Sequence, residues 1–335
     1  MKNLFCISVF LLSFSPGICP ASERQGNVEM TVNITAPEES RDVRVWIPYP
    51  ASNDTQDITD IKVDGNYSRS GIYREKETGN LALYANWEEP EKHRVITLTF
   101  NARAEELVRR DFPDEEQLIP PEIQQYLRST DYIPTDGVVR EIATSITGDG
   151  QRISEKARAV YRWVVANTTR HPDVIGCGTG EVEKVLAKRG GKCADISSVF
   201  VSIARAAGVP AREVFGLRLG KKDIQDMTSG HHCWAEFYVP GYGWVPADPA
   251  DVRKAMLTDA LELDQARDHL EYFFGAVEQY RISLARGGRG YFLNPPQNEG
   301  PLNYFMYPYA EVDGKALEWL AAQKNLKYSI KFKAL

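Results

Sequence analysis

Apolar and polar residues alternate along the first third of the chain, in short runs separated by polar turns. A period of two residues places successive side chains on opposite faces and is typical of half-buried strands. The runs cover residues 28–35, 43–47, 81–87 and 95–100. We therefore predict an all-β domain of sandwich type over residues 23–110. It contains no constellation of His, Cys or carboxylate residues, which favours a structural or substrate-orienting role.

The period changes after a connecting segment rich in Pro and acidic residues. Residues 111–135 contain three separate prolines or proline pairs and suit an interdomain linker. Beyond it, apolar positions from 157 to 165 fall on one helical face, with Ser154 as a candidate N-cap. A second, shorter helix is predicted around residues 182–186, with Thr179 as its candidate cap.

The most regular helical pattern starts at Cys193. Apolar residues follow at the spacing of a buried helix, and Gly208 with Pro210 ends the pattern. Strand signals then return at residues 212–219, 232–239 and 243–247, and again in the tail at 304–312 and 328–332. The pattern predicts an α+β core over residues 136–290, with a C-terminal β extension over 291–335.

The first 22 residues are predicted to be a secretory signal peptide. Lys2 supplies a positive start, an apolar stretch runs from Leu4 to Phe14, and small residues follow near Ala21. The apolar stretch is about half the ~20 residues that a membrane-spanning helix needs. Ile18 before Cys19 disfavours lipid attachment at that cysteine. We therefore expect an exported protein, periplasmic or secreted, with no membrane segment in its mature chain.

Composition narrows the class of partner. The 335 residues include 40 Lys+Arg and 46 Asp+Glu, a net charge of -6, and no basic block. This disfavours nucleic acid as a partner.

Three cysteines remain after the predicted cleavage, and an odd number leaves at least one thiol unpaired within the chain. Cys177 and Cys233 are candidates for a disulfide, with Cys193 as the leftover thiol.

Cys193 has the position expected of an activated thiol. A cysteine at a helix N-terminus lies near unpaired N–H groups and the positive end of the helix dipole, which favours the thiolate. Downstream, His232 enters a strand and has the chemistry to move the thiol proton. Asp248 ends the next strand and is suited to orient the imidazole.

The hairpin between these two strands sets a condition on that arrangement. An even-numbered loop would pair Asp248 with Ala235, on the face away from His232, whereas a loop of three or five residues would pair it with Trp234. Gly241 and Gly243 make a bulged three-residue loop reasonable.

The motifs from Gly190 to Asp195, from Arg205 to Arg212, at His232-Cys233-Trp234 and from Gly243 to Pro249 together resemble the transglutaminase-like superfamily. The resemblance covers roughly residues 155–253. It implies a papain-like α+β core with Cys193 as nucleophile, His232 as general base and acid, and Asp248 as the orienting carboxylate. It does not indicate the substrate, since members include amine-transferring enzymes, peptidases, amidases and inactive proteins.

Neighbouring residues have alternative interpretations. His231 competes with His232 for the role of base, but the motif spacing favours His232. Asp195 is interpreted as stabilising the first helical turn, and Arg212 as structural. Trp234 and Trp244 are more readily core residues than walls of a cleft. The backbone N–H of Cys193 is the natural oxyanion donor, and the sequence offers no single second one.

These patterns predict a cysteine-dependent acyl-transfer enzyme acting on an amide bond of a protein or peptide, with hydrolysis favoured over transamidation. No cofactor is expected. A metal site from the cysteines with His231 and His232 is disfavoured, because Cys-x-x-Cys and His-Glu-x-x-His spacings are absent. The alternative from another class is a non-catalytic binding or assembly module that retains the fold.

Overall fold

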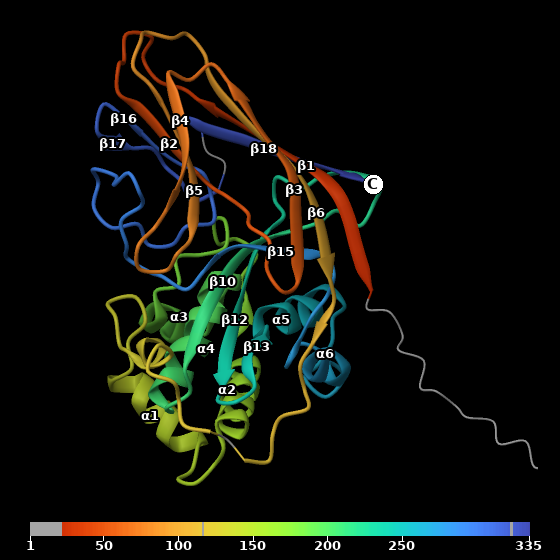
Figure 1. The fold of residues 1–335 in the computed structure, drawn as a ribbon. Helices are drawn as coiled ribbons and strands as arrows, with labels where there is room; N and C mark the ends of the chain where they lie inside the picture. The colour runs from red at the N-terminus through yellow and green to blue at the C-terminus, as the bar shows by residue number, and fades with distance from the viewer. Residues whose placement is uncertain (1–21, 116, 322–323) are drawn as a thin grey trace, which may run out of the picture.

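The protein was analysed as a computed structural model that describes residues 22–335 except 116, 322 and 323. The predicted signal peptide lies outside the described residues, apart from Ser22. Two parts are visible in Figure 1, a pair of β-sheets above and a mixed helix and sheet assembly below. Mixed α+β architecture with antiparallel sheets is the fold class that the sequence predicts.

Two five-stranded antiparallel sheets form the upper part. One has the order β11-β18-β1-β6-β3 and the other β17-β16-β2-β5-β4. Alternating burial along β1 and β6 places Val28, Met30 and Phe100 in the core between the sheets. The strands are β1 (Glu23–Ile34), β2 (Val43–Pro48), β3 (Gln56–Gly65), β4 (Arg69–Arg74), β5 (Leu81–Trp87), β6 (Arg94–Glu105), β11 (Ile224–Asp226), β16 (Tyr309–Val312), β17 (Lys315–Ala316) and β18 (Leu326–Ala334).

Both ends of the chain build this sandwich. The last strand, β18, pairs antiparallel with β1 from Gly26 opposite Ala334 to Ile34 opposite Leu326, and β16 pairs with β2. In Figure 1 the blue β18 accordingly lies beside the red β1. The C-terminal segment therefore contributes β18 to one sheet and both β16 and β17 to the other, and β11 from the middle of the chain pairs with the outer side of β18. Of the predicted tail strand 304–312, only Tyr309–Val312 is a strand.

The lower part packs helices against a four-stranded antiparallel sheet of order β13-β12-β10-β15. The central helix α4 contacts β12 and β10 as well as α1, α2, α3 and α5. The elements are η1 (Gln124–Leu127), α1 (Gly137–Ile146), α2 (Ile153–Asn167), α3 (Val182–Lys188), α4 (Cys193–Ala206), β10 (Ala211–Arg218), β12 (His231–Val239), β13 (Gly243–Ala247), α5 (Pro249–Thr258), α6 (Arg267–Tyr272) and β15 (Arg281–Arg286). Two small pairs complete it, β8 (Thr169–Arg170) with β9 (Gly190–Gly191), and β7 (Leu107–Val108) with β14 (Ala276–Val277).

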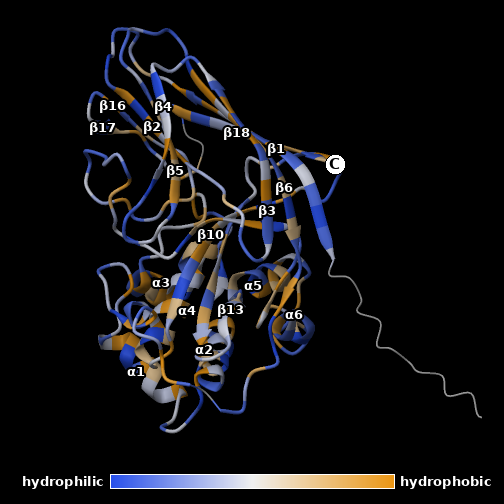
Figure 2. Cartoon of the chain, in the orientation of Figure 1, coloured by the Kyte–Doolittle hydropathy of each residue, from blue (hydrophilic) through white to orange (hydrophobic). Residues whose placement is uncertain are grey.

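Hydropathy explains why α4 is central. Twelve of its fourteen residues are buried, from Cys193 to Ala204, so this helix is covered on nearly all sides. Figure 2 shows orange apolar segments on the helices and strands of this lower part. The nucleophile candidate therefore lies at the start of the most buried of the described helices.

Two predicted helix caps are wrong. The helix α2 begins at Ile153, and Ser154 lies inside its first turn because the Glu155 carboxylate accepts the Arg152 N–H at 3.0 Å and closes the helix start one residue earlier. The helix α3 begins after Glu181, because Gly180 has a left-handed φ of 67° and delays the helical turn beyond Thr179. Neither change alters the face that each helix buries.

Among the described residues, no helix has the length and apolar character required to cross a membrane. The longest described helix, α2, has 15 residues and carries several charges.

The Phe332 side chain on β18 tests how much the C-terminal strand stabilises the sandwich. It is 1% exposed and fills the space over Gly26, where even a Cβ would come within 2.1 Å of its ring. We expect Phe332→Ala to lower the free energy of unfolding by about 3–5 kcal/mol, measured by urea denaturation, because a large buried side chain leaves a cavity. Lys331→Ala on the exposed face of the same strand is the control, and equal effects of the two substitutions would contradict this packing role.

Candidate active site

The thiol of Cys193 lies at the first residue of α4, as predicted. Two short elements lead into it. Gly190 and Gly191 form β9, which pairs in parallel with β8, so that Gly191 lies opposite Arg170. Gly190 has a φ of 152° and lies so close to the Thr169 backbone that a Cβ would meet its carbonyl oxygen at 2.0 Å. The Gly-Gly pair thus permits the close backbone approach that fixes where the helix begins.

Asp195 stabilises the first turn of α4, as predicted, and also ties down a second loop. Its Oδ2 accepts the N–H of Lys192 at 2.9 Å and its Oδ1 accepts the N–H of Gly180 at 2.8 Å. Gly178 lies against this carboxylate, where an added Cβ would be 2.0 Å from Oδ2. The glycines of the loop at residues 176–180, which we call the Gly-rich loop, therefore allow it to pack closely against Asp195 and place Cys177 beside the start of α4.

The hairpin register places His232 and Asp248 together. Val239 pairs with Gly243 across a three-residue loop, and Ala235 pairs with Ala247. This is the odd-numbered loop that the pairing of Asp248 with Trp234 requires, and Gly241 has the left-handed φ of 79° expected for it. His232 Nε2 and Asp248 Oδ2 are 2.7 Å apart in a buried environment.

Each oxygen of Asp248 is occupied. Because Asp248 is the N-cap of α5, its Oδ1 accepts the Asp251 N–H at 2.9 Å, and Pro249 follows at the first helical position. Oδ2 accepts from both His232 Nε2 and Arg281 Nη1. A carboxylate accepts only, so Nε2 carries the hydrogen and Nδ1 is the nitrogen left for the thiol.

A buried charge network surrounds this pair. Arg281 also binds Asp251 at 2.8 Å and Glu278 at 2.6 Å, and Arg218 binds Asp251 at 2.6 Å and Glu278 at 3.1 Å. Two guanidinium groups thus face three carboxylates counting Asp248, which leaves one negative charge for an imidazolium to balance.

The ionisation of His232 follows from that balance. Burial and the positive charge of Arg218 act against its protonated form, but Asp251 and Asp248 outweigh them and raise the pKa of His232. Asp251 itself keeps a pKa well below its usual range, because the charges of His232, Arg218 and Arg281 overcome its burial.

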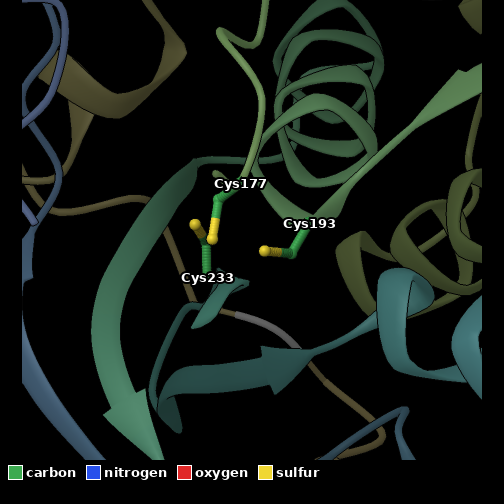
Figure 3. Close-up of side chains that lie close together, drawn as sticks. All are labelled: Cys177, Cys193 and Cys233. Carbon is green, nitrogen blue, oxygen red and sulfur yellow. The ribbon is translucent and has the colours of Figure 1, made fainter. Parts of the chain in front are cut away.

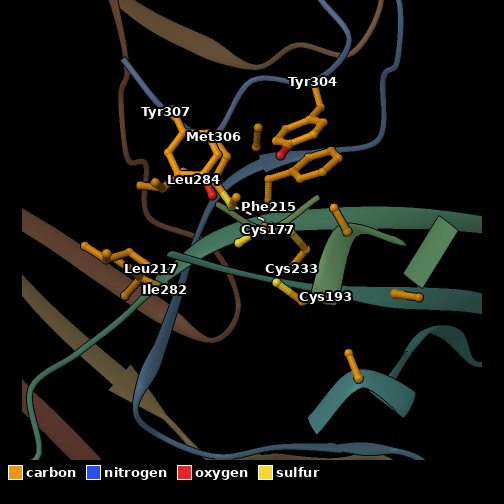
Figure 4. Close-up of a cluster of buried hydrophobic side chains, with 14 of the residues drawn as sticks. Cys177, Cys193, Phe215, Leu217, Cys233, Ile282, Leu284, Tyr304, Met306 and Tyr307 are labelled. Atoms are coloured by element: carbon orange, nitrogen blue, oxygen red, sulfur yellow. Dashed lines mark hydrogen bonds between the residues drawn. The ribbon is translucent and has the colours of Figure 1, made fainter. Parts of the chain in front are cut away.

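Three buried cysteines meet in front of α4. The sulfur atoms of Cys177, Cys193 and Cys233, which we call the thiol cluster, all lie within 4.8 Å of one another. Figure 3 shows the three side chains pointing toward a common centre from the Gly-rich loop, α4 and β12. Around them lie Phe215, Tyr304, Met306 and Tyr307 in an apolar shell (Figure 4).

The three thiols of the cluster differ in their pKa values. The neighbouring thiols of Cys177 and Cys233, together with His232, hold the pKa of Cys193 well below its usual range despite burial. The hydrogen bond with Cys193 raises the pKa of Cys177, and burial raises that of Cys233. The cluster therefore favours negative charge at Cys193 and neutral thiols at Cys177 and Cys233, whose hydrogens reach the His231 carbonyl oxygen at 3.5 Å and the Met306 sulfur at 3.7 Å.

A cavity of about 720 Å³ opens onto the sulfur of Cys193 and the ring of His232. Arg170, Lys192 and Lys254 line it, and so do Tyr307 and Tyr328 from the C-terminal segment. The volume suits a peptide segment of a few residues.

The structure also assigns places to the other residues that the sequence singled out near the site. His231 begins β12 and lines the cavity, and burial lowers its pKa to about 4, so its ring is neutral. Trp234 is 5% exposed in a small core cluster, and neither it nor Trp244 lines the cavity. Arg212 is held by Glu236 at 2.7 Å and packs over the Trp244 ring, a structural role as predicted.

The disulfide considered between Cys177 and Cys233 is not formed, since all three cysteines of the cluster are free thiols. Their sulfur atoms are as close as those of a thiolate metal site, but the Cys177 thiol donates to the His231 carbonyl oxygen and the Cys233 thiol donates to the Met306 sulfur. His232, Asp248 and Asp251 also have ligand spacing for a metal, yet both carboxylates already form ion pairs, Asp248 with Arg281 and Asp251 with Arg281 and Arg218.

Sequence reasoning missed the charge network and the thiol cluster. Arg281 lies on β15, 33 residues beyond Asp248, and nothing in its local sequence distinguishes it from an ordinary strand residue. Asp251 could have been suspected, because Asp-Pro-x-Asp is a helix-start pattern that turns the second carboxylate toward the cap.

Comparisons with known proteins agree with this geometry. Residues 140–249 match the family model of the transglutaminase-like superfamily. An uncharacterised protein of Haemophilus influenzae is 34% identical over 337 residues, covering 91% of this chain and 90% of the relative. The uncharacterised YebA of Bacillus subtilis is 29% identical over 139 residues, which are 37% of this chain and 19% of YebA.

A solved structure has the same fold over most of the chain. A candidate cysteine protease from Cytophaga hutchinsonii aligns with a TM-score of 0.53 and 14% identity, covering 93% of this chain and all of that one. At this identity the likeness concerns the fold alone.

Replacing Cys177 tests whether neighbouring thiols acidify Cys193. Because a hydrogen bond to a thiolate favours the charged form, Cys177→Ala is expected to raise the pKa of Cys193 and to shift the pH profile of its iodoacetamide labelling to higher pH. Labelling is followed by mass spectrometry of the Cys193 peptide. Cys233→Ala should also raise the pKa of Cys193, but by less. A labelling profile that moves to lower pH in either variant would contradict the conclusion that the neighbouring thiols lower the pKa of Cys193.

Proposed function

Because this chain belongs to the transglutaminase-like superfamily, we propose that it is a cysteine-dependent enzyme of acyl transfer that acts on an amide bond. The observation that carries the proposal is the continuous buried connection from Cys193 through His232 to Asp248 at one cavity. We assign Cys193 as nucleophile, His232 as general base and acid, and Asp248 as the carboxylate that orients the imidazole.

In the first half of the reaction the Cys193 thiolate attacks the amide carbonyl carbon and a carbon–sulfur bond forms. The N–H groups of Lys192 and Ala194 are taken by Asp195 and by the Cys177 carbonyl, so the N–H of Cys193 is our candidate donor to the oxyanion. His232 then gives its Nδ1 proton to the leaving amine as the carbon–nitrogen bond breaks, which leaves a thioester.

In the second half, neutral His232 takes a proton from water, the hydroxide oxygen attacks the thioester, and the carbon–sulfur bond breaks to restore the thiolate. An amine could replace water in this step. We favour hydrolysis, because water is the default acceptor and the described cavity is lined by several cations, which disfavour a protonated amine. Asp248 holds the imidazole at Nε2 throughout and favours its protonated state.

We further propose that the protein is exported and acts on protein or peptide substrates outside the cytoplasm. This rests on the signal-peptide pattern of residues 1–22 and on the accessibility of peptides in such a compartment.

The pH dependence of labelling tests the catalytic assignment without a substrate. With the pKa of Cys193 lowered and that of His232 raised, the thiolate–imidazolium pair exists between these two values. Cys193 should therefore react with iodoacetamide at pH 6 at least about tenfold faster than an ordinary thiol of pKa ~8.5. His232→Ala should abolish most of that advantage.

His231→Gln is the matched control, since it alters the adjacent histidine on the other face of the strand and should retain fast labelling at pH 6. If Cys193 in the unaltered protein reacts only near pH 8.5, the catalytic proposal fails and a non-catalytic binding module takes its place.

Export is tested on the full-length chain expressed in a bacterial host. Intact mass and N-terminal sequencing should locate a mature protein that begins near residue 23, in the periplasmic or culture fraction. A full-length product that stays with the cytoplasmic fraction would count against export while leaving the enzyme assignment intact.

A further inference from the structure

The cavity at Cys193 is basic, although the protein as a whole is acidic with a net charge of -6. Four cationic residues line it against a single acid, Asp226. Asp226 is already engaged, since its carboxylate accepts the Thr228 N–H at 2.8 Å. Electrostatic character opposite to that of the whole chain marks this cavity as a place where negative charge is favoured.

Three of the four cations have no acidic partner. Arg218 belongs to the buried network, where Asp251 and Glu278 neutralise it. In the part of the chain that the structure describes, no salt bridge is formed by Arg170, Lys192 or Lys254, which we call the basic wall. Nη1 of Arg170 is buried and has no hydrogen-bond partner among these residues. A buried guanidinium nitrogen without an acceptor costs free energy that a bound anion would recover.

The basic wall is assembled at the reactive sulfur by three separate elements. Arg170 lies on β8 opposite Gly191, two residues before Cys193, and Lys192 directly precedes the nucleophile. Lys254 projects from α5, the helix that Asp248 caps and that contacts β8. Partial burial and then the charges of Arg218 and Arg170 lower the pKa of Lys254, while Asp251 and Cys193 act in the opposite direction.

We propose that the basic wall is a subsite for a carboxylate carried by the acyl substrate next to the scissile amide. Arg and Lys recognise carboxylates by charge-assisted hydrogen bonds, and peptides supply carboxylates either as acidic side chains or as a free C-terminus. This inference rests on the proposed function, because it gives the substrate class of the same site. The free carboxylate of the substrate would lie among Arg170, Lys192 and Lys254, and the carbonyl carbon of its scissile amide would lie next to the Cys193 thiolate.

The first test compares two alkylating agents that differ in one charge. Iodoacetate carries a carboxylate and iodoacetamide does not, and both form the same kind of bond with Cys193. The basic wall predicts a high ratio of the iodoacetate rate to the iodoacetamide rate in the unaltered protein. The ratio should fall roughly threefold or more in Arg170→Gln/Lys254→Gln, and also when salt is raised from about 0.05 M to about 0.5 M.

Controls separate charge from folding. Lys62→Gln removes one positive charge from an exposed position on β3 and should leave the ratio unchanged. Lys254→Arg retains the charge and should retain most of the ratio. The iodoacetamide rate reports whether each variant still presents a reactive Cys193, and if it collapses in the double variant, the single variants Lys254→Gln and Lys192→Gln decide the question.

A second arm identifies the source of the carboxylate. Peptides that the unaltered protein cleaves are tested as pairs, Glu against Gln next to the scissile bond, and a free C-terminus against an amide. The carboxylate member should have the lower KM, and Arg170→Gln/Lys254→Gln should remove that preference.

The failures are distinguishable. A Cys193 that does not react with iodoacetamide at pH 6 overturns the proposed function. A Cys193 that reacts fast, with a rate ratio that no variant of the basic wall changes, overturns the carboxylate subsite alone.

Discussion

A charged group in a dry interior must have each of its hydrogen-bonding positions satisfied, and in this protein that requirement falls on Asp248. Its two oxygens bind a helix N-terminus, a guanidinium and an imidazole, which come from α5, β15 and β12. Removing any one of these would leave a buried charge without its partner, at a cost of several kcal/mol. The position of His232 is therefore a consequence of how Asp248 is neutralised.

The same electrostatic balance reaches the sulfur. Arg218 and Arg281 do not fully offset Asp248, Asp251 and Glu278, so a proton on His232 is favoured. A positive imidazolium favours the Cys193 thiolate in turn. Cys177 and Cys233, whose own pKa values are raised, lie beside that sulfur as neutral thiols and help to keep the negative charge at Cys193. Burial, usually unfavourable to charge, is tolerated here because opposite charges and donors surround each ion.

The β-sandwich is physically part of the site. Tyr328 on β18 and Tyr307 from the preceding segment line the cavity. Contacts of Gln56 on β3 with Ser283 on β15, at 2.7 Å between Oε1 and the backbone N–H, join the sandwich to the sheet that carries Arg281. The parts of the sandwich that reach the cavity are thus the C-terminal segment and β11, whereas the described residues 23–110, for which a structural or substrate-orienting role is predicted, contribute no residue to the cavity lining.

Periodicity and short motifs in the sequence determine the local elements that carry the candidate site. The helix that begins at Cys193, the strands of His232 and Asp248, and the three-residue hairpin loop that brings the two together all depend on local spacing of apolar residues and glycines. Such features are legible in a sequence because neighbours along the chain create them.

Only the tertiary structure decided the rest. The pairing of β18 with β1, the meeting of Cys177, Cys193 and Cys233, and the contact of Arg281 with Asp248 join residues far apart in the chain. An arginine or a cysteine is compatible with many surroundings, and its role depends on which charges and donors the fold brings within a few ångströms. Local patterns do not contain that information, because the energy of a buried ion depends on its neighbours in space rather than in sequence.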